Sequence, residues 1–250
     1  MTNRPRTTAT EMRLRCLLRL LRMLMLMLLV MGTGAAWAGP VVGTVVQLSG
    51  PLLERKADGT VRVLALKSEV ESGGTLVAEK NTYAQLRFID DSEITLRPGT
   101  TFRIDRFAWE AGKPEADSAA FSLLKGGLRS ITGLLGKRSK EKYVLKTPSA
   151  TIGIRGTVFI AQWLETPADG LPAGLHLAVS EGAIVVASAG GTLGFEAGQS
   201  GWVPGPQAAP LRVPPNPGLR FAPPPSFGEP GGQAAGGVGR EQAGVDCVVR

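Results

Sequence analysis

Between residues 40 and 203 the chain alternates polar and apolar residues in short runs that are separated by turn residues. In one such run Leu86 and Phe88 fall on one face of an extended chain, while Arg87 falls on the other. The runs recur about every eight to twelve residues, a spacing typical of all-β sandwiches, barrels and solenoids. The pattern predicts one all-β domain over residues 39–203, with short strands in a solenoid-like or sandwich arrangement.

Turn signals and glycines refine this prediction. Asp58-Gly59 between two alternating runs indicates a β-hairpin. The longest helix candidate, residues 121–135, contains three glycines, each of which costs about 1 kcal/mol in a helix interior, so we expect strands or broken turns there. Residues 42–74 and 181–198 share the order strand, glycine turn, strand, glycine turn. This order is common in β-rich sequences, and the alternative is a repeat of stacked β-rungs in a solenoid.

The composition changes after Val203. Residues 204–230 contain ten prolines, and residues 231–250 are rich in glycine, alanine and glutamine. Such a segment buries too little apolar surface to offset the entropy that ordering would cost. We therefore expect residues 204–250 to form a disordered Pro/Gly-rich tail, in which Cys247 is an exposed thiol.

The first 38 residues have the three parts of a secretory signal peptide. Arginines precede an uncharged apolar run from Met23 to Met31, and Ala36-Trp37-Ala38 offers a small-x-small cleavage site. The uncharged stretch from Met23 to Ala38 is shorter than the roughly 20 apolar residues of a membrane span. We expect cleavage after Ala38, no membrane span afterwards, and export to a bacterial periplasm or beyond. A retained anchor is the alternative.

Most of the net charge of +7 belongs to this N-terminal segment. Residues 1–38 hold six of the 28 basic residues and one of the 21 acidic residues, which leaves 22 against 20 in the remainder. Within the remainder, residues 125–146 are strongly basic and predict a site for an anionic partner. Its candidate residues are Lys125, Arg129, Lys137, Arg138, Lys140 and Lys142. In an exported protein such cations can meet lipid headgroups, acidic glycans or an acidic protein, but nucleic acid is not an expected partner. A solvated loop is the alternative.

The sequence offers little catalytic chemistry. His176 is the single histidine, and Cys247 is the single cysteine outside the N-terminal segment, which excludes a His/Cys zinc cluster and a disulfide within the exported chain. His176 is expected to be structural. Ser122 and Ser139 begin S-x-x-K strings, but the S-D-N and K-T-G elements of penicillin-binding enzymes are missing. We expect no enzyme, no metal site and no cofactor, and keep an S-x-x-K acyltransferase as an alternative.

One string is much more specific than the others: Thr147-Pro148-Ser149-Ala150-Thr151-Ile152-Gly153-Ile154-Arg155-Gly156-Thr157-Val158-Phe159. It resembles the T-P-x-A-x-x-G-[IV]-R-G-T-x-F signature of the FecR domain family. Residues 84–96 and 124–129 resemble two further segments of that domain, so the resemblance covers roughly residues 41–203. One departure is clear, because Asp91 stands where the family has a turn glycine.

The residues of this motif suit a tight structural crossing. Gly153 and Gly156 bracket Arg155, which allows backbone conformations or close approaches that a Cβ would hinder. Alternation places Ile152 and Ile154 on one face and Arg155 on the other. If buried, Arg155 would need carboxylate or carbonyl partners. We therefore favour a structural role over ligand binding for Arg155. The motif residues expected to be structural are Thr147, Pro148, Gly153, Ile154, Arg155, Gly156 and Thr157.

The resemblance also bears on function. The best-known FecR proteins are membrane regulators, in which a cytoplasmic anti-sigma domain precedes a transmembrane helix and the periplasmic domain receives a signal from an outer-membrane receptor. Only 22 residues precede the apolar run of this chain, so the resemblance implies the exported domain without the anti-sigma region. We expect a non-enzymatic exported interaction or scaffold module. The alternatives are a periplasmic sensor subunit that works with a separate membrane protein, and a binder of acidic envelope glycans through residues 125–146.

Overall fold

The computed structural model describes residues 17–23, 39–215, 218–219 and 221–227. The chain divides into two units, Met1–Ala38 and Gly39–Arg250. In the first unit residues 17–23 form a short helix, and the rest of the predicted signal peptide lies outside the described residues. No helix in the described part of the chain has the length and apolar character needed to cross a membrane.

The second unit consists mainly of strands, which confirms the all-β prediction. In chain order its elements are β1 (Val41–Leu48), β2 (Leu52–Arg55), β3 (Val61–Leu64), β4 (Glu69–Glu71), β5 (Thr75–Ala78), β6 (Ala84–Phe88), β7 (Glu93–Leu96), β8 (Thr101–Ala108), η1 (Pro114–Ala116), β9 (Ser118–Ile131), α2 (Leu134–Arg138), η2 (Lys140–Lys142), β10 (Tyr143–Lys146), β11 (Thr151–Leu164), β12 (Gly174–Ser188), β13 (Gly191–Glu196), β14 (Ser200–Val203), β15 (Leu211–Val213) and η3 (Pro225–Phe227). The strands in residues 121–131 replace the helix candidate, as the glycines predicted.

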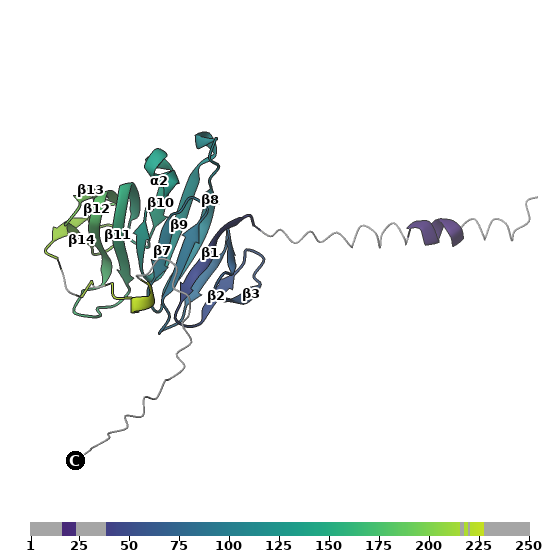
Figure 1. Cartoon of the computed structure of the whole chain (residues 1–250), viewed down its shortest axis with the longest axis horizontal. Helices are drawn as coiled ribbons and strands as arrows, with labels where there is room; N and C mark the ends of the chain where they lie inside the picture. Colours follow the sequence, from purple (N-terminus) through teal and green to yellow (C-terminus); the bar gives the residue numbers. More distant parts are fainter. Residues whose placement is uncertain (1–16, 24–38, 216–217, 220, 228–250) are drawn as a thin grey trace, which may run out of the picture. The chain divides into compact units, whose positions relative to one another are not determined.

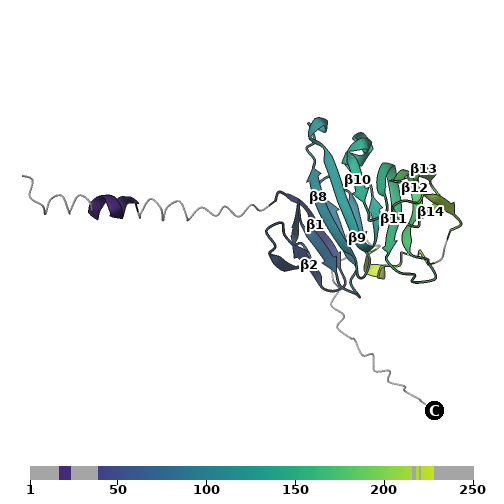
Figure 2. The ribbon, with the colours of Figure 1, turned by 180° about the vertical axis from the view of Figure 1, so that it is seen from behind.

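The 15 described strands form one hydrogen-bonded sheet. Its main path is β15-β14-β12-β11-β10-β9-β7-β6-β1-β4, and the other strands branch from it. Only β9 and β10 pair in parallel among these strands. Figure 1 shows the strands side by side from β2 and β3 at one end of the sheet to β13 and β14 at the other, and Figure 2 shows the same order from behind.

Three long strands divide this sheet into two layers because they change partners along their length. The first half of β9 pairs with β8 and β10, and its second half pairs with β7 and β11. Similarly, β11 pairs first with β10 and then with β9, while β12 pairs first with β14 and then with β13. We call the part with β2, β3, β5, β8, β10 and β13 layer 1. The part with β1, β4, β6, β7, β14 and β15 is layer 2.

An aromatic cluster packs between the layers. The ring centroid of Phe88, on β6, lies 4.9 Å from that of Phe107 on β8 and 5.3 Å from that of Phe121 on β9. Because β6 pairs with neither β8 nor the first half of β9, these rings meet across the space between the layers. All three are buried, and each contributes about 1.5–3 kcal/mol by leaving water. The facing layers correspond to the sandwich alternative, within one continuous sheet.

Each long strand passes between the layers at a glycine with positive φ. These glycines are Gly126 in β9 (φ +80°), Gly156 in β11 (φ +63°) and Gly182 in β12 (φ +70°). A Cβ on Gly182 would lie 1.9 Å from the carbonyl oxygen of Gly156, so β11 and β12 bend in contact with each other. The tight crossing thus brings the backbone of Gly156, a residue of the motif, against Gly182, which lies outside the motif.

The chain after β14 differs from the predicted tail. Residues of β15 pair with β14, and the rings of Phe221 and Phe227 lie 6.1 and 6.2 Å from the ring of Tyr83, which precedes β6. Strand pairing and aromatic contacts therefore order residues that composition alone assigned to disorder. The predicted boundary at residue 203 is too early for the described residues up to 227. Residues 228–250, including Cys247, lie outside the described part.

Candidate functional site

The motif begins in the turn between β10 and β11. The hydroxyl of Thr147 donates to the carbonyl of Ala150 at 2.8 Å and accepts from its N–H at 3.0 Å. The backbone N–H of Thr147 donates to the same carbonyl at 2.9 Å. Pro148 follows in an exposed position, where its fixed φ suits a turn. Thr147 and Pro148 thus lie in the tight turn that joins β10 to β11.

The second half of the motif forms the bend of β11. Thr157 is buried, and its N–H donates to the hydroxyl oxygen of Thr132 at 2.9 Å. In return, the hydroxyl and the N–H of Thr132 donate to the carbonyl of Thr157 at 2.8 and 3.0 Å. These bonds fasten the bend at Gly156 to the residue that follows β9.

Gly153 and Arg155 differ from the prediction. A Cβ on Gly153 would meet no atom within 4 Å, so no close crossing requires a glycine there. The side chain of Arg155 is exposed and makes no hydrogen bond or ion pair with the described residues. Ile152 and Ile154 are buried on the opposite face, as alternation predicted. The structure therefore gives Arg155 no contact that would support a structural role.

The six cations predicted to bind an anionic partner do not share one surface. Arg138 instead holds the loop before β9: its Nε and Nη2 donate to the two carboxylate oxygens of Asp117 at 2.8 and 2.7 Å. It also donates to the carbonyls of Glu110 and Ala111. Its guanidinium carbon lies 5.6 Å from the ring centroid of Trp109. These contacts engage the guanidinium of Arg138 with the loop, although the residue is exposed.

We call the pair of hydrogen bonds between Arg138 and Asp117 the clamp. Asp117 is its buried member, with 4% of the residue exposed. Hydrogen bonds from Arg138 hold the pKa of Asp117 below its ordinary value, although burial acts in the opposite direction. The hydroxyl of Ser139 adds a hydrogen bond of 2.7 Å. Lys142 supports the same loop through the carbonyls of Pro114 and Glu115, at 3.0 and 2.7 Å. Two of the six predicted cations, Arg138 and Lys142, thus hold the fold together.

The other four predicted cations are spread over different parts of the domain. Lys137 and Lys140 are exposed on α2 and η2. Arg129 is half-buried in the second half of β9, whereas Lys125 is exposed in the first half. Nearness in sequence therefore did not predict nearness on the surface.

A different set of cations lies on the outer face of layer 1, the side directed away from the core. The strand register pairs Arg103 with Ser122, Ser122 with Lys146, and Lys146 with Thr151. Directly paired residues point to the same side of a sheet, so these side chains share one face. We call the surface formed by the cations of this face the cationic face. Its members are Arg55, Arg103, Arg106, Lys125, Lys146 and Arg155.

The centre of the cationic face consists of small residues. The register pairs Arg106 with Ala120, Ala120 with Val144, and Val144 with Gly153. Arg155 lies two residues beyond Gly153 and hence on the same side. The acidic residues on this face are Asp105, which forms an ion pair with Arg103, and Glu196. Glu196 lies opposite Ala183 of β12, which in turn pairs with Arg155. A partner can therefore approach the strands closely while contacting cations at the rim.

The outer face of layer 2 is covered instead. After β15, residues 214–215 and 221–227 line hollows on this face, and together with residues 218–219 we call them the C-terminal strap. Near β14, Pro214 and Pro215 of the strap line a hollow of about 280 Å³ together with His176 and Trp202. The rings of His176 and Trp202 stack with centroids 6.2 Å apart. Nε2 of His176 lies 2.8 Å from the carbonyl oxygen of Pro172, and burial lowers the pKa of His176. This packing agrees with a structural histidine.

The two serines of the S-x-x-K strings are engaged in other contacts. The hydroxyl of Ser122 donates to the carboxylate of Asp105 at 2.6 Å, and that of Ser139 donates to Asp117. Neither hydroxyl is hydrogen-bonded to the lysine of its S-x-x-K string. Within the described residues, no group of three or more histidine, cysteine, aspartate or glutamate side chains is placed to hold a metal ion.

Comparisons with solved structures find partial alignments at low sequence identity. Two crystal structures of a candidate anti-sigma factor from Parabacteroides distasonis ATCC 8503 align with TM-scores of 0.43 and 0.44, at 13% and 14% identity. Each alignment covers 56% of this chain and 59% of that protein, so this chain spans less than two thirds of its length. A structure titled "Cell surface anchoring domain" aligns with a TM-score of 0.25 and 21% identity, over 25% of this chain and 83% of the other. No curated protein matches the chain.

A family model gives the more direct finding. Residues 74–185 match the model described as "FecR protein". The matched segment extends from β5 to β12, and it contains both the turn at Thr147 and the bend at Gly156. The FecR resemblance seen in the sequence is therefore confirmed for residues 74–185.

Proposed function

We propose that this protein is an exported, non-enzymatic interaction module that docks an anionic partner protein on the cationic face. The observation that carries the proposal is the shared orientation of cations from separate strands around a centre of small residues. Arg106, Lys146 and Arg155 are exposed and make no ion pair with the described part of the chain. Their charges are thus available to a partner without breaking a contact of the fold.

The chemistry of the cationic face favours carboxylate or phosphate groups. An arginine presents a planar fork that binds two oxygens of one anion, and several arginines fix the orientation of a partner. Gly153 leaves the strand surface bare between Arg106 and Arg155, so a chain or loop of the partner fits between them. In this proposal the motif has two roles: it forms the bend of β11, and it presents Arg155.

Export is part of the same proposal and is supported by sequence features of residues 1–38. The second unit begins at Gly39, directly after the predicted cleavage site. Its first strand begins at Val41, so cleavage after Ala38 would leave the strand complete. Intact-mass measurement of the protein purified from the cell envelope tests this: a chain that begins at residue 39 supports export with cleavage. A chain that retains Met1 contradicts it.

Two alternatives follow from the sequence. A periplasmic sensor subunit would bind a separate membrane signalling protein, and an envelope-glycan binder would bind an acidic polysaccharide. The glycan alternative was based on residues 125–146, but Arg138 and Lys142 of that segment are engaged within the fold. We therefore favour a protein partner, and the identity of the captured molecule separates these outcomes.

Co-purification from envelope extracts tests the proposal. The test variant combines Arg106→Gln, Lys146→Gln and Arg155→Gln. A matched control carries Lys137→Gln and Lys140→Gln, which remove exposed cations outside the cationic face. We expect the control and the wild type to retain the same partner, and the test variant to lose it at unchanged melting temperature. Because exposed charges are screened by salt, raising ionic strength should also release the partner. Equal retention by all three proteins would contradict the proposal.

A further inference from the structure

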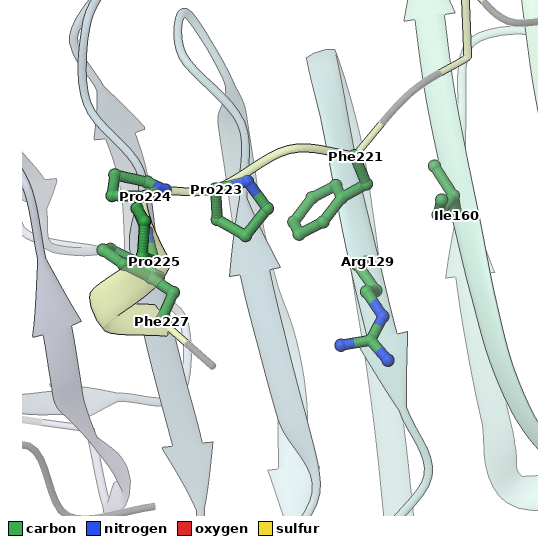
Figure 3. A pocket seen from close by; sticks show the side chains of 7 residues that line it. All are labelled: Arg129, Ile160, Phe221, Pro223, Pro224, Pro225 and Phe227. Carbon is green, nitrogen blue, oxygen red and sulfur yellow. The ribbon is translucent and has the colours of Figure 1, made fainter. Parts of the chain in front are cut away.

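The C-terminal strap and the outer face of layer 2 line an open hollow of about 360 Å³ beside Arg129. Five of its lining residues come from the strap, and Ile160 of β11 completes it, as Figure 3 shows. The strap residues are Phe221, Pro223, Pro224, Pro225 and Phe227. The volume lies in the range of small-molecule sites, roughly 300–1,000 Å³.

Arg129 places a positive charge in this apolar setting. It is half-buried, and the register sets it beside Thr95 on one side and Ile160 on the other, neither of which carries a charge. Its guanidinium makes no hydrogen bond or ion pair with the described residues. Partial burial of a cation is unfavourable unless an anion accompanies it, so the position is suited to an anionic group from outside the fold.

The walls of the hollow are held in place. Phe221 and Phe227 both contact the ring of Tyr83 edge-on, with interplanar angles of 84° and 68°. Prolines between them restrict the backbone of the strap. The rings and prolines therefore offer a fixed apolar surface next to one arginine fork.

We propose that this hollow is a binding site for a carboxylate joined to an aromatic or branched apolar group. Arg129 binds both oxygens of the carboxylate, and the apolar group packs against Phe221, Phe227 and Ile160. A free organic acid and the C-terminal residue of a peptide share this chemistry. The site is independent of the cationic face, because it lies on the other layer of the domain.

Calorimetric titration of the purified chain tests the site with matched probes. Phenylacetate carries the carboxylate and the ring, phenylacetamide replaces the charge by a neutral group of the same shape, and benzylamine reverses it. We expect saturable binding of phenylacetate, with affinity for the amide lower by about tenfold or more because a charge-assisted bond is lost. Benzylamine should not bind. Acetyl-glycyl-phenylalanine and its C-terminal amide form a second pair, which reports whether a peptide end is accepted.

Variants of the chain give the matched controls. Arg129→Met should abolish the preference for the acid over the amide, and Phe221→Ala should weaken both ligands. Lys137→Met removes an exposed cation of α2, outside both the hollow and the cationic face, and should bind like the wild type. Binding by the peptide acid alone assigns the site to peptide ends, and binding by phenylacetate extends it to free acids. The proposal is overturned if wild-type protein binds neither acid, or binds each acid and its amide equally. An unchanged acid preference in a folded Arg129→Met protein would also overturn it.

Discussion

On both outer faces of the domain, alternate residues of each strand point away from the core. One of these faces is exposed to solvent, and the other is covered. On layer 1, Arg106, Lys146 and Arg155 are exposed around small residues. On layer 2, Thr95 and Gln162 are only 5% exposed, on the face that the C-terminal strap contacts. The chain thus covers one face with its own residues and leaves charged side chains on the other. Exposed charges suit a reversible partner, whereas a covered face adds to stability.

The largest expected effect is on the bend that both layers share. In Gly182→Ala the new Cβ would meet the carbonyl oxygen of Gly156 at 1.9 Å, at a φ that disfavours side chains. We expect a loss of about 3 kcal/mol in the free energy of unfolding, measured by urea denaturation. Gly153→Ala, in open space, should change it by less than about 0.5 kcal/mol. Similar losses in the two variants would contradict the assignment of Gly182 as the tight crossing.

A smaller effect should follow removal of one anchor of the strap. Phe221→Ala deletes a half-buried ring that contacts Tyr83, and we expect a loss of about 1–2 kcal/mol in the free energy of unfolding. Val63→Ala, at a side chain 72% exposed on β3, is the control and should be nearly neutral. If Phe221→Ala is equally neutral, the strap does not stabilise layer 2 and the contrast between the faces weakens.

The clamp on the loop before β9 predicts a pH dependence. Because Arg138 lowers the pKa of folded Asp117, the carboxylate stabilises the fold fully above its unfolded pKa of about 3.9. This contribution is lost as pH falls through the lowered folded value. The stability difference between wild type and Asp117→Asn should therefore be constant near neutral pH and shrink below about pH 4. Urea denaturation across that range measures it, and a difference that does not change with pH would exclude the clamp.

The smallest effect on stability is expected for the cationic face itself. The exposed side chain of Arg155 makes no hydrogen bond or ion pair with the described residues, so Arg155→Ala should change the free energy of unfolding by less than about 0.5 kcal/mol. Thermal melting of the variant and of Arg138→Ala gives the comparison, and Arg138→Ala should be clearly the less stable. A comparable loss in Arg155→Ala would restore the structural role that the sequence motif first indicated.

Local patterns predicted much of the fold. The alternation around Leu86 and Phe88 gave the strand and its buried face, and the glycines near Gly126 correctly argued against a helix. Contacts between distant residues were not predictable in this way. Nothing in the sequence spacing links Arg138 to Asp117, or Phe221 to Tyr83, because the strand topology brings them together.

The candidate site shows the same limit. The sequence drew attention to consecutive cations, but the cationic face combines Arg103, Lys146 and Arg155 from three strands. The alternation did indicate that Arg103 points outward, because it lies between the buried Phe102 and Ile104. Only the register of the sheet shows which of the alternating cations share a face.

Site-specific photo-crosslinking in cells tests the central claim most directly. A photoreactive amino acid replaces Thr151, which is exposed and paired with Lys146 on the cationic face. The matched control replaces Thr166, an exposed threonine in the loop between β11 and β12. The proposed function predicts a specific protein adduct from position 151, identified by mass spectrometry, and none from position 166. The same adducts from both positions, or none from position 151, would contradict a docking role for the cationic face.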